Sequence, residues 1–529
     1  MSEAGDQQRP LGAGQPVFVL SDDVERTQGE DAQSANITAG KAVAESVRTT
    51  LGPNGMDKML VSDGDVVVTN DGATILDEMD IEHPAADMIV EVAQAQDEEV
   101  GDGTTTAAVL TGELLAEAED LLETDVHPTT IVEGYARAAD IAVETVDESV
   151  VSDDLDDEVL QQVAVSSMTG KGTGGATADQ LAAAIVDAVR RGQSEDGSVD
   201  ADAVQVVAQS GRSSTATEIV EGVVLDDVPE REDTSRRFED ATVAVVNQSL
   251  EQRETEIDVE YNIDTADQFA DAVASEKAAL QEFVDTFVAH DVDVVFGTSD
   301  VADELEVMLA NEDIAVYEHV SDDDAAAVAK ATGARLIGQI EDIDAADLGT
   351  AESVAVETFD DEALTFVEGG AASTTMTLFV RGGTGHVIEE LERAVSDGVD
   401  SVVSALTGGG VVPGAGAVEI AMANAVRDEA ASIEGRQQLA VEAFADAVEA
   451  LPRTLAQNAG RDPIDSLVEL RAANESGRAG IIGSGGDAEV VDPVERGVLD
   501  PAAVKREATR SATEAATMIA RIDDVISAQ

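Results

Sequence analysis

Three glycine-containing segments carry residue types that could bind phosphate groups and a metal ion. They are Leu51-Gly-Pro-Asn-Gly55, Asn70-Asp-Gly-Ala-Thr74 and Val100-Gly-Asp-Gly-Thr-Thr-Thr106. Glycine lets the backbone approach a ligand closely, so that backbone N–H groups can donate hydrogen bonds to phosphate oxygens. With the carboxylates of Asp71 and Asp102, this spacing is suited to holding a nucleoside triphosphate together with its metal ion.

The third segment combines an acid with a predicted helix start. Thr104-Thr-Thr106 is expected to begin a helix, whose free N–H groups would bind phosphate. Asp102 would repel phosphate unless Mg²⁺ lies between them. Taken alone, Asp102 could simply cap the helix, and Asp71 could simply belong to a tight Asn-Asp-Gly bend. A Walker A sequence after a predicted strand is lacking, so the phosphate site depends on the joint spacing of all three segments.

The composition bounds the class of protein. The chain has 529 residues, of which 43 % are apolar. That length allows about three or four domains. Its 111 acidic and 30 basic residues give a net charge of −81. An acidic disordered chain is one interpretation, but the helical periodicity argues against it. Because the acidic residues are spread along the whole chain, we favour adaptation to molar salt, where the Debye length falls to ~3 Å.

The same composition excludes several functions. Basic clusters that would neutralise phosphates are lacking, so we expect no nucleic-acid partner. Cysteine is absent, which excludes disulfides, thiol catalysis and zinc-thiolate sites. The first 16 residues lack the regions of a signal peptide, and no run approaches the ~18 apolar residues of a membrane span. We expect a soluble, cytoplasmic protein with no membrane partner.

Hydrophobic periodicity divides the chain into helical and α/β regions. Helical patterns extend from about residue 31 to 150 and from about residue 399 to the end, and the apolar positions of 83–93 fall on one helix face. Residues 240–345 instead alternate β-rich runs with helical stretches, which is typical of an α/β domain. The β-rich runs are Thr242–Val246, Val292–Phe296, Ile314–Tyr317 and Ala334–Ile337.

The order and spacing of the three glycine-containing segments resemble the ATP site of group II chaperonins, the thermosome or TCP-1 family. Further blocks in family order cover essentially the whole chain beyond its N-terminal tail. Among them are Met79–Ala86, Leu378–Thr384, Leu451–Gly460 and Ser511–Ile519. The chain is therefore identified as a member of this family, of haloarchaeal type.

The resemblance implies a multidomain α and α/β fold. A helical, equatorial-type ATP-binding base would comprise residues 17–150 and 399–529, after a flexible tail at 1–16. A two-piece intermediate hinge domain would comprise 151–214 and 366–398. An inserted α/β, apical-type substrate-binding domain would comprise 215–365.

A helical protrusion at about 249–289 would provide this apical-type domain with a built-in lid. The residues support a helix independently of the resemblance, because five apolar side chains follow helical spacing. They are Leu280, Phe283, Val284, Phe287 and Val288. This stripe could instead pack on the α/β core, whereas the polar stretch 251–267 suits a projecting tip.

The resemblance also implies roles for individual residues. Asp71 would orient the attacking water, Asp397 would act as general base, and Asp102 would hold Mg²⁺. Lys171 would sense the γ-phosphate, and Asp500 would contact the ribose. The other cofactor-binding residues implied are Leu51, Gly52, Pro53, Gly72, Gly103, Thr104, Thr105, Thr106, Gly414 and Ala415.

Simpler alternatives remain open for three of these residues. Asp397 could be an exposed helical carboxylate, and Lys171 could be a solvated lysine in a flexible loop. Asp500 could cap a helix that has Pro501 at its first position.

The expected function is that of an ATP-dependent chaperonin subunit, an ATP hydrolase that uses ATP and Mg²⁺. It would fold unfolded or partly folded proteins in the cavity of stacked rings made of the same or related subunits. The alternative is a structural or regulatory ring subunit that binds nucleotide with little ATPase activity. This alternative stays open because the family's triple glycine reads Gly414-Ala-Gly416 here, and the added methyl could narrow the backbone's approach to the ligand.

Overall fold

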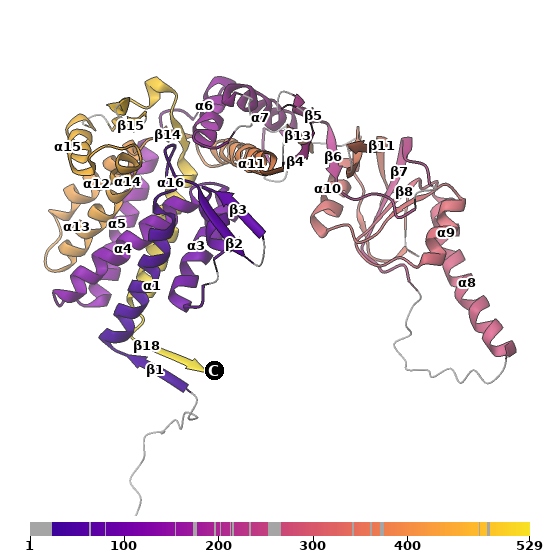
Figure 1. Ribbon diagram of the computed structural model, residues 1–529, viewed down its shortest axis with the longest axis horizontal. Coiled ribbons are helices and arrows are strands. Elements are labelled where there is room, and N and C mark those ends of the chain that lie inside the picture. The colour runs from indigo at the N-terminus through magenta and orange to yellow at the C-terminus, as the bar shows by residue number, and fades with distance from the viewer. Residues whose placement is uncertain are drawn as a thin grey trace, which may run out of the picture.

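The computed structural model has three regions in a row (Figure 1). The chain starts in the first region, crosses the middle region to the third, and returns through the middle region to the first. The first region contains helices from both ends of the chain, the middle region is mixed, and the third is an α/β region. The structure describes residues 24–62, 65–79, 81–153, 155–172, 177–194, 197–200, 203–211, 213, 216–231, 234–251, 266–340, 343–359, 362–370, 375–383, 385–474, 477–483 and 487–528.

The first region is a helical body in which segments from both chain ends share one hydrophobic core. The helices are α1 (Glu30–Arg48), α2 (Gly72–Asp77), α3 (Pro84–Val100), α4 (Thr104–Glu123), α5 (Pro128–Glu148), α12 (Ala417–Ala430), α13 (Gln437–Val448), α14 (Ala450–Asn458), α15 (Pro463–Ala473) and α16 (Ala502–Ala520). In the core, Tyr135 packs edge-to-face on Phe444, with 5.8 Å between the ring centroids. The Tyr135 hydroxyl donates to the Leu114 carbonyl at 2.9 Å. Tyr135 of α5 therefore anchors the middle of helix α4 and contacts α13 at the same time.

Short two-stranded ladders join parts of the helical body. They are β1 (Val24–Gln28) with β18 (Asp524–Ala528), β2 (Lys58–Ser62) with β3 (Asp65–Thr69), β14 (Val411–Pro413) with β17 (Leu499–Pro501), and β15 (Gly480–Ile482) with β16 (Glu489–Val491). A 3₁₀ turn, η6 (Val494–Arg496), precedes β17. All four ladders are antiparallel, and the first places the two ends of the described chain side by side (Figure 1).

The middle region packs three helices on a three-stranded sheet. The helices are α6 (Asp157–Met168), α7 (Ala178–Gly192) and α11 (Gly385–Thr407), and the sheet has the order β4 (Val204–Ser210), β13 (Met376–Gly382), β5 (Glu218–Val220). Strand β13 is parallel to β4 and antiparallel to β5. Helix α11 runs across the expected boundary at residues 398 and 399, and Val395 and Val402 on either side of it belong to one hydrophobic cluster.

The third region is a seven-stranded sheet covered on both faces by helices. Its strands run in the order β6 (Gly222–Leu225), β12 (Glu362–Glu368), β11 (Gly349–Phe359), β7 (Arg237–Val246), β8 (Val294–Gly297), β9 (Ala315–Tyr317), and β10 (Leu336–Ile337) also pairs with β7. Side chains alternate along β7, because Val243 and Val245 enter one hydrophobic cluster and Ala244 and Val246 enter another. Helix α10 (Asp322–Thr332) contributes to the first cluster, while α8 (Ala266–Ala289) and α9 (Asp303–Asn311) contribute to the second.

These elements confirm the two helical regions and the four β-rich runs predicted from the sequence. The apolar stripe also lies on one helix, α8, and Leu280, Phe283, Val284 and Phe287 are buried against the sheet whereas Val288 is 44 % exposed. Packing on the α/β core is therefore confirmed for this half of the expected protrusion. Residues 252–265 of the expected protrusion, and the expected tail at 1–16, lie outside the described residues. Within the described part of the chain, no helix is both long and apolar enough to cross a bilayer.

Candidate functional site

A cavity of about 560 Å³ opens where the helical body meets the middle region. Residues from all three glycine-containing segments line it, together with Lys171, Asp397, Ala415 and Asp500. Of the sequence-predicted site residues, only Gly72 and Gly414 are not among the residues that line the cavity. The fold therefore brings together side chains from both ends of the chain and from the middle region.

The third glycine-containing segment forms the start of helix α4. The helix begins at Thr104, as predicted, and its N-cap is Gly103 in the left-handed conformation, with φ 83°. The first-turn N–H groups of such a helix have no intrahelical acceptor, so they are available to phosphate. Asp102 does not cap this helix: its Oδ1 accepts a hydrogen bond from Gly103 N at 2.6 Å, and its Oδ2 accepts one from Ser401 Oγ at 3.0 Å. The capping interpretation of Asp102 is therefore wrong.

The second segment forms the start of helix α2, which packs directly on the start of α4. Asp71 is the N-cap of α2, and its Oδ2 accepts hydrogen bonds from both Thr74 N and Thr74 Oγ1 at 2.7 Å. This arrangement fixes the orientation of the Asp71 carboxylate. A methyl group on Gly72 would lie 2.3 Å from Thr105 Oγ1 and 3.0 Å from Thr105 N, so only glycine allows the two helix starts to meet.

The first segment is a turn held by helix α14 and touched by the loop that carries Lys171. Asn458 Nδ2 donates to the Leu51 carbonyl at 2.9 Å, which holds the start of the turn. Gly52 has φ 81°, and a methyl group there would lie 2.3 Å from Leu455 Cδ2. On the other side, a methyl group on Gly170 would lie 2.5 Å from the Pro53 carbonyl oxygen. The turn is thus a contact point between the helical body and the middle region.

Lys171 and Asp397 form an ion pair at the cavity. Both side chains are 21 % exposed, and both belong to the middle region. The neighbouring Gly172 N donates to Glu390 Oε1 at 2.9 Å, so the loop has a second contact with α11. Neither simpler alternative holds, since Lys171 is paired rather than solvated and Asp397 is mostly buried.

The turn from Gly414 to Gly416 connects β14 to helix α12. Ala415 has φ 57°, a left-handed conformation that is unfavourable for a residue with a Cβ atom. Its methyl group lies beside Gly480, because a methyl on Gly480 would be 2.9 Å from Ala415 Cβ. Its carbonyl accepts a hydrogen bond from Ile481 N at 3.0 Å. The turn therefore adjoins β15, and a methyl on Gly414 would lie 2.9 Å from Asp500 Oδ1.

Asp500 has a different role in the fold from the predicted one. The N-cap of α16 is Pro501 and makes no side-chain capping bond, and the helix begins at Ala502. The predicted capping by Asp500 is therefore wrong, and the reason is that Asp500 and Pro501 belong to strand β17. Asp500 Oδ2 instead accepts from Lys505 Nζ at 2.7 Å.

Sequence reasoning missed four charged residues around the cavity. Lys505 and Glu419 form an ion pair at 2.8 Å, and both line the cavity. Asp97 also lines it, and Asp400 lies against Gly101, where a methyl would be 2.2 Å from Asp400 Cβ. Only the scarcity of basic residues in this chain could have drawn attention to Lys505, because periodicity does not reveal which charges meet in the fold.

Several acidic side chains lie close together around Gly101 and repel one another. Burial, followed by the charges of Asp97 and Asp102, raises the pKa of Asp400 to about 7. Burial, followed by the charges of Asp71 and Asp102, raises the pKa of Asp97 to about 6. Carboxylate oxygens are the ligands that Mg²⁺ prefers, and a divalent cation would relieve this repulsion. The residues present therefore fit a bound Mg²⁺.

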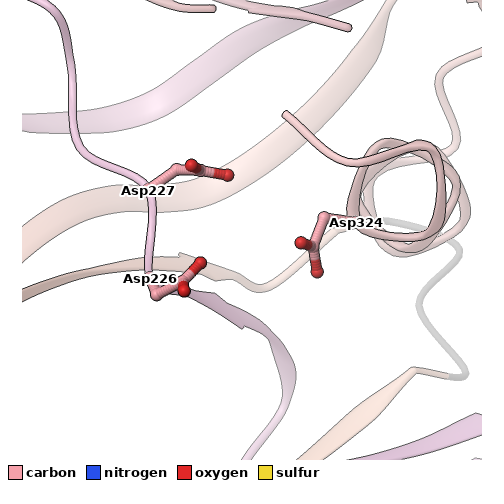
Figure 2. A group of neighbouring side chains, drawn as sticks. All are labelled: Asp226, Asp227 and Asp324. Atoms are coloured by element: carbon pink, nitrogen blue, oxygen red, sulfur yellow. The ribbon is translucent and has the colours of Figure 1, made fainter. Parts of the chain in front are cut away.

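Two further acidic groups lie in the α/β region, away from this cavity. Figure 2 shows one of them, in which Asp226 and Asp227, just after β6, face Asp324 on α10. One carboxylate oxygen from each lies within 4.8 Å of the others. Burial, followed by the charge of Asp226, raises the pKa of Asp227 to about 6. The second group has the same spacing and contains Glu230, Glu306 and Glu318. These contacts show that like charges meet locally in this fold.

Known proteins of one family resemble nearly the whole chain. Residues 43–529 match the TCP-1/cpn60 chaperonin family. Thermosome subunit 3 of Haloferax volcanii is 59 % identical over 518 residues, which is 97 % of this chain and 99 % of that protein. Thermosome subunit alpha of Halobacterium salinarum is 50 % identical over 97 % of this chain and 92 % of that protein. A thermosome subunit of Methanopyrus kandleri is 48 % identical over 98 % of this chain and 96 % of that protein.

Proposed function

The chain belongs to the TCP-1/cpn60 chaperonin family, and we propose that the cavity between its helical body and middle region is the site of Mg²⁺-ATP hydrolysis. It is a nucleotide-binding chaperonin that couples ATP hydrolysis to protein folding. The observation that carries the proposed site is the convergence of Asp71, Asp102 and the start of α4 with the Lys171–Asp397 pair.

The contacts described above support a role for each residue. The first-turn N–H groups of Thr104, Thr105 and Thr106 would bind phosphate oxygens, and the Leu51–Pro53 turn would lie beside them. Mg²⁺ would be held by Asp102 and, when bound, would neutralise phosphate charge. Asp71, whose carboxylate is fixed by Thr74, would orient the attacking water, and Asp397 would accept its proton.

We propose the three-domain division expected from the sequence, with helix α11 as the element that joins hinge and base. Lys171 and Asp397 both belong to the hinge, whereas Asp71 and Asp102 belong to the base. The complete catalytic set therefore exists only when hinge and base are in contact. Hydrolysis would depend on this closure, and so would a lid formed by residues 249–267, upstream of the α8 residues that pack on the sheet.

Assembly and surroundings are part of the same proposal. The subunits would form stacked rings of the same or related chains in a cytoplasm, and would bind unfolded or partly folded proteins. The −81 charge and the haloarchaeal relatives support adaptation to molar salt. A regulatory subunit with little ATPase activity remains the second candidate, and the left-handed Ala415 is the observation that favours it.

An ATPase assay in molar KCl tests the proposed site. Activity should require Mg²⁺ and disappear with a chelator. Asp397→Ala should keep nucleotide affinity while turnover falls about 10²-fold or more, as expected for loss of a general base. The matched control is Asp428→Ala, an exposed aspartate of α12 that does not line the cavity. Unchanged turnover in Asp397→Ala would exclude the role of Asp397, and no activity in the unmodified chain would favour the regulatory subunit.

A further inference from the structure

Two helices and one ladder place three charged residues at the same end of the cavity. Strands β14 and β17 pair with Val412 opposite Asp500. Helix α12 begins at Ala417, shortly after β14, and carries Glu419 in its first turn. Helix α16 begins at Ala502, directly after β17, and carries Lys505. Because both helices start from the same ladder, Glu419 and Lys505 meet beside Asp500.

Lys505 bridges the two carboxylates. Its Nζ donates to Glu419 Oε1 at 2.8 Å and to Asp500 Oδ2 at 2.7 Å. Side-chain exposure increases along the series, from 5 % for Glu419 through 13 % for Lys505 to 26 % for Asp500. Glu419 is therefore the most deeply buried member and Asp500 is the most accessible to a ligand.

Lys505 is charged in this environment. Burial disfavours the protonated amine, but the adjacent carboxylates of Asp500 and Glu419 outweigh burial and raise the pKa of Lys505 well above its usual value. Glu419 Oε2 is buried and has no hydrogen-bond partner among the described residues, so Lys505 provides the compensation for the Glu419 charge. A buried carboxylate with one cationic partner holds that partner firmly in place.

The Asp500 carboxylate is oriented by Lys505, from which its Oδ2 accepts a hydrogen bond. Its Oδ1 faces the Gly414 backbone with no side chain between them, since a methyl group at Gly414 would be 2.9 Å away. The first turn of α16 is held by a further contact. Gln96 Nε2 donates to both the Asp102 carbonyl at 2.8 Å and the Val504 carbonyl at 3.4 Å. This glutamine joins the phosphate-binding loop to the residue before Lys505.

We propose that Glu419 and Lys505 are positioning residues that hold the Asp500 carboxylate ready for the hydroxyl groups of the nucleotide sugar, and thereby make the site selective for ribonucleotides. The inference rests on the proposed function, in which Asp500 contacts the ribose. A carboxylate held in one orientation loses less entropy when it accepts hydrogen bonds from a ligand. A site built to bind a substrate hydroxyl rejects the analogue that lacks it, because its own polar group is then left without a partner.

The test is a comparison of ATP with 2′-deoxy-ATP and 3′-deoxy-ATP as substrates for the full chain in molar KCl. Lys505→Met should raise KM for ATP about threefold to tenfold, the cost of ordering one side chain, and should leave kcat within about twofold. KM for at least one deoxy analogue should change much less, so the preference for ATP should shrink. Lys505→Arg, which keeps a cation between the carboxylates, should restore much of the preference.

Two companion variants make each outcome decisive. Lys505→Met leaves Glu419 as an unpaired buried charge, so the double variant Glu419→Gln/Lys505→Met, which removes both charges, is measured beside it. Asp500→Asn tests the underlying nucleotide placement. If Asp500→Asn loses the preference for ATP while Lys505→Met and Glu419→Gln/Lys505→Met both keep it, the positioning role is overturned and the proposed site stands. If Asp500→Asn also keeps the full preference, the ribose contact itself is wrong. A lower thermal midpoint with an unchanged preference in Lys505→Met and in Glu419→Gln/Lys505→Met would mean that the ion pair is merely structural, which also overturns the inference.

Discussion

Gly72→Ala tests whether the Asp71 and Asp102 segments form one rigid phosphate-binding frame. A methyl group at this position would lie 2.3 Å from Thr105 Oγ1, 3.0 Å from Thr105 N and 3.1 Å from Thr105 Cα. The hydroxyl can rotate away, but the backbone atoms cannot, so the starts of α2 and α4 must separate by a few tenths of an ångström. Overpacking of this kind costs about 1–3 kcal/mol of folding free energy.

The same displacement should also reduce activity. Thr105 belongs to the first turn of α4, whose N–H groups are proposed to bind phosphate, and Asp71 precedes Gly72 directly. Misplacement by ~1 Å can cost about 10²-fold in rate, so a smaller shift should lower kcat/KM for ATP by about tenfold. ATPase kinetics and thermal unfolding in molar KCl measure the two effects on the same preparation.

The matched control is Gly383→Ala. No heavy atom lies within 4 Å of a methyl group at Gly383, and its backbone is not left-handed. This variant should therefore stay within about 0.5 kcal/mol of the unmodified chain and keep its activity. If Gly72→Ala matches Gly383→Ala in both thermal midpoint and kcat/KM, the two segments do not act as one frame.

Four further predictions address other parts of the molecule. Ala415→Gly should stabilise the chain slightly without weakening ATP binding. Relief of the strain of a left-handed alanine, about 1–2 kcal/mol, exceeds the cost of about 0.4–1 kcal/mol from the greater conformational entropy of glycine in the unfolded chain. A lower thermal midpoint would show that packing of the Ala415 methyl group beside Gly480 is the larger effect. Burial, followed by the charge of Asp446, raises the pKa of Glu117 from 4.5 to about 7, so the destabilisation that this carboxylate causes is absent below pH 4.5 and complete above pH 7. Glu117→Gln should therefore raise stability at pH 8 by about 1 kcal/mol, after allowance for solvent screening, and not at pH 4.5, whereas equal gains at both values would contradict this. Lower KCl should loosen the rings in sedimentation, because the repulsion between chains that each carry a net charge of −81 is then less screened; rings that stay intact at low ionic strength would count against salt adaptation. ATP with Mg²⁺ should protect residues 249–267 from limited proteolysis, and equal cleavage in both conditions would mean that this segment is not a nucleotide-controlled lid.

The parts of the fold and of the site that the sequence predicts correctly are those with a local physical cause. The start of α4 at Thr104 follows from Gly103, since a left-handed residue ends the preceding backbone direction and the threonines continue as helix. The strands of the α/β region follow from short runs of β-branched residues, whose alternating side chains enter two hydrophobic clusters. In both cases the preference that determines the element is carried by adjacent residues, even where the packing partners are distant in the sequence.

The wrong predictions concern groups whose partners are distant in the sequence. The Asp102 carboxylate does not cap α4 and instead accepts a hydrogen bond from Ser401, which is 299 positions away. Asp500 fails as a cap because β17 extends through Pro501 to pair with Val411, which delays the start of α16. Lys505 could not be assigned to Glu419, 86 positions away, because neither residue type nor spacing encodes that contact.

The Lys171–Asp397 pair gives the proposed hinge closure a direct chemical consequence. Gly170 packs against the Pro53 carbonyl of the helical body. Gly172 and Lys171 both contact α11, the helix that carries Asp397. Any motion of α11 relative to the helical body must therefore move Lys171 and Asp397, the proposed γ-phosphate sensor and proposed general base, together. A phosphate that attracts Lys171 competes with Asp397 for the same cation, so nucleotide binding would release the carboxylate at the moment when the hinge delivers it. In the proposed mechanism, this ion pair thus makes the availability of the Asp397 carboxylate depend on whether the γ-phosphate is present.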